Sequence, residues 1–103
     1  MYLNVFRSRK RADHDHAAYQ ADGARMDELA RARAGFVDYK TFAAEDGETV
    51  TISLWESEAA AKAWAADAEH RAAQARGRAD YYETYTMYTC AEAKETVFER
   101  GGA

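Results

Sequence analysis

The order of periodic segments constrains the fold of this chain more than any other feature. Residues 2–9 (YLNVFRSR) mix aromatic and β-branched side chains with polar ones at period two and predict a first strand. Apolar residues then recur at helical spacing between Asp13, the expected N-cap, and Gly35, the expected left-handed residue at the helix end. Residues 36–43 and 48–55 predict two further strands. A turn at Asp46-Gly47 would join them in a tight hairpin.

The second half of the chain predicts another helix and another strand. Ser57 is the expected N-cap of an alanine-rich helix that includes Trp64. A short continuation from about residue 68 to residue 76 precedes Gly77, a second candidate for a left-handed helix end. Residues 81–90 (YYETYTMYTC) predict an aromatic last strand.

The predicted order is therefore strand, helix, strand, strand, helix, strand. This order is typical of a ferredoxin-like βαββαβ domain of the α+β class, an antiparallel sheet with the helices on one face. The 103 residues suit one domain. We expect a core of about residues 1–90 and a polar C-terminal extension of residues 91–103.

Bulky apolar side chains occur on both faces of the first and the last predicted strands, although helices would cover only one face. In the first strand Leu3 and Val5 alternate with Tyr2 and Phe6, and in the last strand Tyr81, Tyr85 and Met87 oppose Tyr82 and Tyr88. An uncovered apolar face is an association surface. We therefore expect a homodimer whose two sheets pack together as an eight-stranded barrel, a dimeric α+β barrel. Dimerisation would also help so short a chain to enclose a cavity.

Charge and cysteine content narrow the possible partners and compartment. The formal net charge of -4, with acidic and basic residues interleaved, argues against nucleic acid as a partner. Cys90 is the single cysteine, so the sequence supports neither an internal disulfide nor a thiolate metal cluster. No apolar run reaches the 18 residues of a membrane span, and the first residues do not resemble a signal peptide. We expect a cytoplasmic protein.

Common metal and catalytic motifs are absent from the sequence. His14 and His16 form a D-H-D-H run with their neighbours, but residues two apart do not share a helix face, so a solvated helix start is the favoured interpretation. The chain contains no phosphate-binding glycine loop, nucleophile elbow, CxxC or HExxH.

His70 and Gln74 are the best candidates for chemistry, because a spacing of four places them on one helix face, shortly after Trp64. An imidazole beside apolar walls can act as a general base, and an amide can stabilise an oxyanion. The alternative is structural, with Trp64 in the core, His70 at a helix junction and Gln74 hydrogen-bonded to the backbone near the helix end. The roles of Asn4 and Arg78 also have two interpretations each. Asn4 is either a pocket group or a sheet-face hydrogen bonder, and Arg78 either holds an acidic group or forms a salt bridge.

Several short motifs occur in a characteristic order along nearly the whole chain. They are F-R-S-R at residues 6–9, D-H near the first helix, G-F at 35–36, E-D-G at 45–47, W-E-S-E at 55–58, Trp64, E-H at 69–70, A-Q at 73–74, G-R at 77–78 and the tyrosines that follow. Together they resemble the antibiotic biosynthesis monooxygenase domain family. The resemblance implies a dimeric α+β barrel with one of two activities, cofactor-independent oxygenation of polycyclic phenols or quinols, or oxidative haem breakdown.

The haem-degrading branch of that family is similar in having an Asn on the first strand, a Trp on the second helix and a His ten residues after that Trp. Trp64 fits this pattern, but the residue ten positions later is Gln74, which cannot supply the imidazole that ligates haem iron. Haem degradation is therefore disfavoured.

The resemblance and the spacing together predict a cofactor-independent monooxygenase that acts with dioxygen on a phenol or quinol. The predicted catalytic residues are His70 as base and Gln74 and Asn4 as polar anchors, and the predicted substrate-binding residues are Phe6, Trp55, Trp64 and Arg78, with no metal or cofactor. The alternative is a non-catalytic, ligand-binding or stress-related dimer. An enclosed, partly polar cavity of about 300 Å³ or more beside Trp64 and His70 would favour a ligand site, and tight packing around both residues would favour the binding or structural interpretation.

Overall fold

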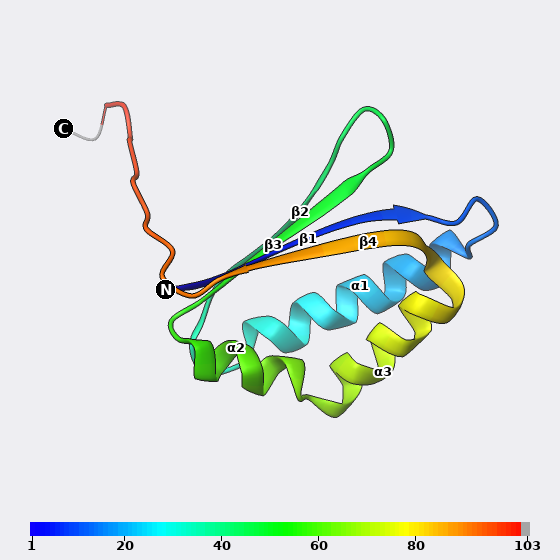
Figure 1. Cartoon of the computed structure of the whole chain (residues 1–103), viewed down its shortest axis with the longest axis horizontal. Coiled ribbons are helices and arrows are strands. Elements are labelled where there is room, and N and C mark those ends of the chain that lie inside the picture. Colours follow the sequence, from blue (N-terminus) through cyan, green and yellow to red (C-terminus); the bar gives the residue numbers. More distant parts are fainter. Residues whose placement is uncertain (102–103) are drawn as a thin grey trace.

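The computed structural model describes residues 1–101, which form one antiparallel sheet with helices on one face (Figure 1). The strands are β1 (Tyr2–Lys10), β2 (Phe36–Ala43), β3 (Thr49–Trp55) and β4 (Tyr82–Cys90), in the order β2-β3-β1-β4. The helices are α1 (His16–Arg31), α2 (Glu58–Ala65), α3 (Ala68–Arg76) and one π-helical turn, η1 (Gly77–Tyr81). The ferredoxin-like α+β prediction is confirmed.

Side-chain caps explain where the helices begin. Ser57 caps α2 as predicted, because its hydroxyl accepts a hydrogen bond from the Ala60 amide at 3.1 Å. The cap of α1 is Asp15, which accepts from the Ala18 amide at 3.0 Å. The prediction of Asp13 as the cap is therefore wrong, and its carboxylate instead binds the guanidinium of Arg11.

Glycine lies at two positions where a side chain would not fit. Gly35 has the predicted left-handed conformation (φ +81°), but it lies beyond Ala32, the residue that ends α1. The expectation of a left-handed Gly77 is wrong, since its φ is -57° and the chain continues into η1. Glycine is required there for another reason, because a Cβ atom would lie 2.5 Å from the ring of Tyr82.

A β-bulge alters the expected faces of β4. Opposite β1, Arg9 pairs with Thr84 and Lys10 pairs with Tyr82, so the intervening Glu83 is an extra residue. The bulge brings Tyr82 to the helix side of the sheet together with Tyr85. The expectation that these two tyrosines occupy opposite faces is therefore wrong.

The core lies at one end of the space between the sheet and the helices. Trp55 of β3 is its centre, with no exposed surface, and its ring packs against Phe36 and Trp64. Met26, Ala30 and Ala61 complete the buried cluster. Towards the other end of the sheet the same space opens into a cavity.

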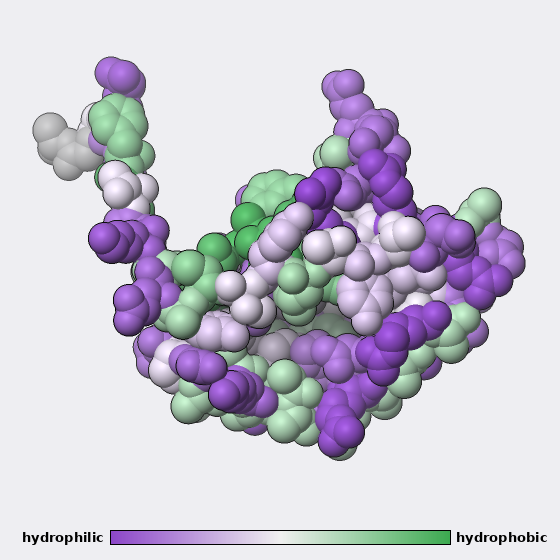
Figure 2. All heavy atoms as spheres, viewed as in Figure 1, coloured by the Kyte–Doolittle hydropathy of each residue, from purple (hydrophilic) through white to green (hydrophobic). Residues whose placement is uncertain are grey.

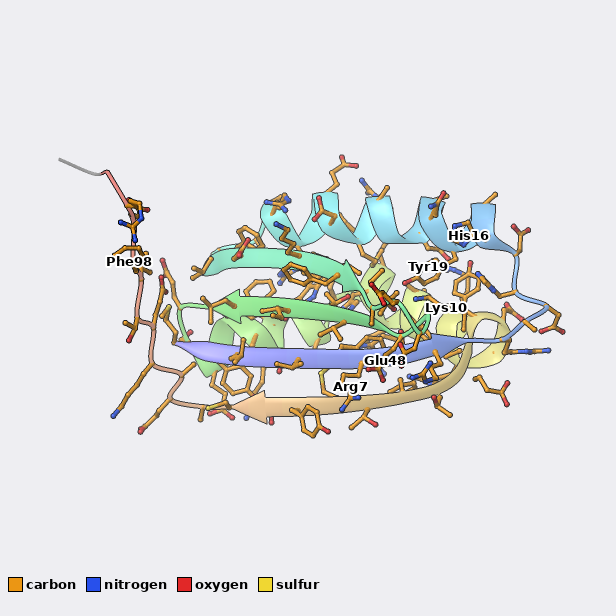
Figure 3. All side chains as sticks on the ribbon, turned by 90° about the horizontal axis from the view of Figure 1, so that it is seen from above. Arg7, Lys10, His16, Tyr19, Glu48 and Phe98 are labelled. Atoms are coloured by element: carbon orange, nitrogen blue, oxygen red, sulfur yellow. The ribbon has the colours of Figure 1, made fainter. Side chains whose placement is uncertain are left out.

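The opposite face of the sheet is uncovered. Strand pairing places Leu3, Val5, Val50, Ile52 and Leu54 on it, together with the exposed Phe42 and Tyr88. Apolar side chains gather on this side in Figure 2. An ion pair between the guanidinium of Arg7 and the carboxylate of Glu48, at 2.9 Å, also lies on this face (Figure 3).

The described part of the C-terminal extension forms an arm that leads away from the sheet (Figure 1). It has no helix or strand, and Val97 and Phe98 on it are 64% and 77% exposed. Residues 102 and 103, the rest of the predicted extension, lie outside the described residues. Within residues 1–101 none of the helices combines the length and apolar character needed to cross a bilayer.

Candidate functional site

A cavity of about 680 Å³ lies between the sheet and the helices, where Figure 2 shows the molecule hollowed. Strands β1, β2, β3 and β4 form one wall and α1, α2, α3 and η1 the other. Six of the seven predicted site residues line it, namely Asn4, Phe6, Trp64, His70, Gln74 and Arg78. The volume exceeds 300 Å³ and falls within the range of small-molecule pockets, although the cavity is partly open to solvent and not fully enclosed.

His70 is held in place by the break between α2 and α3. Asp67 caps α3, because its Oδ1 accepts a hydrogen bond from the backbone amide of His70 at 3.0 Å. Its Oδ2 accepts from the guanidinium of Arg33 at 3.0 Å, which fixes the carboxylate. His70 consequently lies in the first turn of α3, and its ring stacks on that of Trp64 with centroids 4.1 Å apart and planes at 13°.

The hydrogen bond of the His70 ring determines which nitrogen is basic. Nδ1 lies 3.0 Å from the backbone oxygen of Trp64, and since a carbonyl oxygen only accepts, Nδ1 carries the proton. The lone pair of the neutral ring is therefore on Nε2. Burial lowers the pKa of His70 below its usual value, opposed by the bond to Trp64 and the charge of Asp67. A neutral imidazole with a free basic nitrogen is the form that a general base requires.

Aromatic rings close the end of the cavity away from Trp64. Phe6 lies at its strand side, with its ring centroid 5.4 Å from that of Tyr82 and 5.2 Å from that of Tyr85. Tyr19 of α1 packs edge-on against Tyr82 at 6.3 Å. Rings at both ends make the cavity suited to a flat, apolar ligand.

Three of the predicted polar residues present free groups to the cavity. Within residues 1–101, the amides of Asn4 and Gln74 form no hydrogen bond and the guanidinium of Arg78 forms no ion pair. The structural alternative for Gln74 required a backbone bond, and that for Arg78 required a salt bridge. The partners that these alternatives need are not found among the described residues.

Trp55 is the predicted site residue that the structure places elsewhere. It does not line the cavity and is fully buried behind Trp64. Its position on the helix side of β3, directly opposite Tyr2 of β1, puts it in the core. Trp55 therefore supports the wall formed by Trp64, and its expected contact with substrate is wrong.

Sequence reasoning missed the polar residues that β2 and β3 contribute, among them Tyr39, Thr41, Thr51 and Ser53. It also missed a clamp at the opposite wall, in which the carboxylate of Asp22 binds Arg76 at 2.9 Å and accepts from the Tyr81 hydroxyl at 2.7 Å. This clamp ties α1 to the end of α3. The guanidinium of Arg76 lowers the pKa of Asp22, so the carboxylate stays ionised.

The histidine pair at the start of α1 lies outside the cavity. Nε2 of His14 lies 3.2 Å from Nδ1 of His16, because His14 precedes the helix and the two rings can meet edge to face. The part of the chain that the structure describes contains no group of three or more potential metal ligands at these histidines or elsewhere.

Comparison with known proteins agrees with the fold and the motif order. The sequence profile of the antibiotic biosynthesis monooxygenase family matches residues 1–76. This chain belongs to that family. The uncharacterised protein YqjZ of Bacillus subtilis is similar, with 30% identity over 98 residues that cover 95% of this chain and 85% of YqjZ.

Solved structures share the fold at lower identity. Rv0793 from Mycobacterium tuberculosis superposes with a TM-score of 0.81 and 20% identity, covering 93% of this chain and 98% of its own. SnoaB from Streptomyces nogalater, a cofactor-independent oxygenase, superposes with a TM-score of 0.77 and 20% identity, covering 95% of this chain and 97% of its own. At this identity the likeness establishes the fold.

Proposed function

We propose that this protein is a cofactor-independent monooxygenase that acts on an aromatic phenol or quinol. The observation that carries the proposal is a half-buried His70, neutral and basic at Nε2, in the wall of a 680 Å³ cavity that also holds aromatic rings. Family membership and the likeness to SnoaB support it.

The first step is removal of a proton from the aromatic hydroxyl by Nε2 of His70. The resulting anion is electron-rich and transfers one electron to dioxygen, and recombination of the two radicals forms a carbon–oxygen bond. The protonated His70 returns its proton to the peroxide anion, and loss of one water molecule from the hydroperoxide leaves one oxygen atom in the product. The residues of this chain supply the base and orient the ring for this reaction.

The free amides have a role in the same step. Gln74 lies one turn after His70 on α3 and faces the cavity, so its NH₂ group can donate to the substrate oxygen as negative charge develops. Asn4 offers a second amide donor on the strand wall, as an anchor for another oxygen of the substrate. Arg78 provides a positive charge for an acidic substituent of the substrate.

The presence of Gln74 in the cavity also argues against haem as a ligand of this site. Ten residues after Trp64 the cavity presents an amide in place of an imidazole. An amide does not provide the axial ligand that haem iron needs in that branch of the family. The proposed reaction therefore uses no haem.

Oxygen consumption with a panel of naphthols and naphthohydroquinones tests the function, with autoxidation subtracted. We expect His70→Ala to lower the turnover number by about 10²–10⁴-fold, since general bases contribute that much. His14→Ala is the matched control, because His14 lies outside the cavity, and it should retain full activity. Unchanged oxygen uptake in His70→Ala would remove the base assignment. Ligand binding without oxygen uptake by the wild type would favour a non-catalytic binding protein.

We also propose that two copies of the chain pack through the uncovered sheet face. The apolar side chains of this face include Phe42 and Tyr88, which are 48% and 52% exposed. A patch of this kind on a small protein marks an association surface. Sedimentation velocity at micromolar concentration should give twice the mass of the 11.6 kDa chain. A monomeric mass would contradict the proposal.

A further inference from the structure

The helix side of the sheet carries three cross-strand rows of polar side chains, and two of them are satisfied internally. Ser8 of β1 pairs with Thr49 of β3, and their hydroxyls lie 3.0 Å apart. Thr51 of β3 pairs with Thr41 of β2, with hydroxyls 2.8 Å apart. In both rows the two hydroxyls are hydrogen-bonded to each other.

The third row is different. Asn4 of β1 pairs with Ser53 of β3, which pairs with Tyr39 of β2, so their side chains form one line across the cavity wall. Ser53 is 7% exposed. Within residues 1–101 the Asn4 amide, the Ser53 hydroxyl and the Tyr39 hydroxyl form no side-chain hydrogen bond. We call these three residues the open row.

The open row faces the cavity and is not sealed in the core. Asn4 and Tyr39 are only partly buried, and within residues 1–101 the indole Nε1 of Trp55 is the side-chain atom that is fully buried without a hydrogen-bond partner. The open row therefore has free hydrogen-bonding capacity towards the cavity, beside two rows whose hydroxyls are already paired with each other. The partner of the open row is expected to be a group that enters the cavity.

The chemistry of the open row limits what that partner is. Burial raises the pKa of the Tyr39 hydroxyl to about 12, so this group remains a neutral donor at physiological pH. The hydroxyl of Ser53 and the NH₂ group of Asn4 can donate as well. The row itself carries no charged side chain, and a neutral oxygen acceptor suits it better than an anion.

We propose that Asn4, Ser53 and Tyr39 form a subsite that binds a neutral carbonyl or hydroxyl oxygen of an aromatic ligand. This inference rests on the proposed ligand site but not on the proposed oxygen chemistry. It adds a second recognition point on the strand wall, whereas His70 and Gln74 lie on the helix wall. The preferred substrate then carries two oxygens, one ionised by His70 and one held by the open row.

Two small probes that differ in a single oxygen test the subsite. The bicyclic ketone 1-tetralone has a carbonyl, and tetralin is the same ring system without it. We expect the double variant Ser53→Ala/Tyr39→Phe to bind 1-tetralone about tenfold or more weakly than the wild type, because two hydrogen bonds are lost. Tetralin binding should change by less than about twofold. Isothermal titration calorimetry or amide chemical-shift titration measures both.

The double variant Thr41→Val/Thr51→Val is the matched control, since it removes two cavity hydroxyls that are bonded to each other and leaves neither one unpaired. It should leave the ratio of the two probe affinities unchanged. The unfolding temperature of ligand-free Ser53→Ala should equal or exceed that of the wild type, because its hydroxyl has no partner to lose. A structural role would instead lower it.

Three results would overturn the subsite. They are equal effects of the double variant on both probes, a marked loss of stability in Ser53→Ala, and no saturable binding of 1-tetralone to the wild type at millimolar concentration. If the probe preference is found but no phenol or quinol supports oxygen uptake, the proposed function fails and the subsite stands. If oxygen uptake depends on His70 while the probes are not distinguished, the subsite alone fails.

Discussion

The two faces of the sheet are made by the same strands but differ in polarity and in whether helices cover them. The helix side holds a partly polar cavity in which several side chains have no partner within the described residues. The other side is apolar and uncovered, and the Arg7–Glu48 ion pair also lies on it. Since side chains alternate along a strand, neighbouring residues such as Asn4 and Val5 serve different purposes. Ligand binding and association are therefore expected to be separable by mutation.

The largest expected difference between the faces is in stability. Trp64→Ala removes a buried ring that packs on both Trp55 and His70, and it should lower the free energy of unfolding by about 3–5 kcal/mol. Thr86→Ala, on the uncovered face opposite Arg7, should change it by about 0.5 kcal/mol or less. Urea unfolding measures both. Similar losses in the two variants would show that the covered face does not dominate stability.

A smaller effect is expected when the uncovered face is charged. Tyr88→Lys places an ammonium group opposite Val5 in the middle of the proposed interface. We expect the dimer dissociation constant to rise by about tenfold or more, because two copies of the charge would be buried against an apolar surface. Binding of 1-tetralone in the cavity should not change.

Sedimentation velocity over a range of concentrations measures the association of this variant. Glu28→Lys is a suitable control, because it adds positive charge on the exposed side of α1 and should leave the dimer intact. A Tyr88→Lys dimer as tight as that of the wild type would place the interface elsewhere.

The smallest expected effect is a pH dependence that belongs to the cavity side. Burial lowers the pKa of His70 in the folded protein, so the unfolded chain binds a proton first as pH falls. This contribution to stability is complete at a pH above the pKa of histidine in the unfolded chain, about 6.5. It is lost as the pH falls through the lower pKa of His70 in the folded protein.

The variant His70→Phe isolates that contribution, because it keeps an aromatic ring over Trp64 without a titrating group. Between pH 7 and pH 5 the wild type should lose more stability than His70→Phe in urea unfolding, and the carboxylates common to both proteins cancel in the comparison. Parallel pH profiles would show that His70 is not desolvated.

The fold was predictable because its determinants are local. Strand alternation, helical spacing and the cap at Ser57 each act within a few residues, and they gave the correct element order. The errors have physical causes of their own. Two aspartates compete to cap α1, and Asp13 is taken by Arg11 while Asp15 caps. Gly77 is required by its contact with Tyr82, a residue on the next strand that spacing along α3 does not reveal.

The helix wall of the site was predictable for the same reason, since His70 and Gln74 share a helix face. On the strand wall, Asn4 and Phe6 of β1 were predicted correctly, but the contributions of β2 and β3 were not. Whether Ser53 or Tyr39 faces the cavity depends on how β2 and β3 pair, including a bulge between Phe36 and Asp38. Trp55 was predicted to contact substrate but lies in the core. A tryptophan at the end of a strand can occupy either position, and the helix that covers it decides which.

The stack of His70 on Trp64 has a practical consequence for anyone who works with this protein. The chain has two tryptophans, and Trp55 is sealed in the core while Trp64 shares a face with the imidazole and borders the cavity. A proton or a ligand that reaches His70 thus also alters the surroundings of one indole. The fluorescence of Trp64 is therefore expected to report on protonation of His70 and on ligand binding in the cavity.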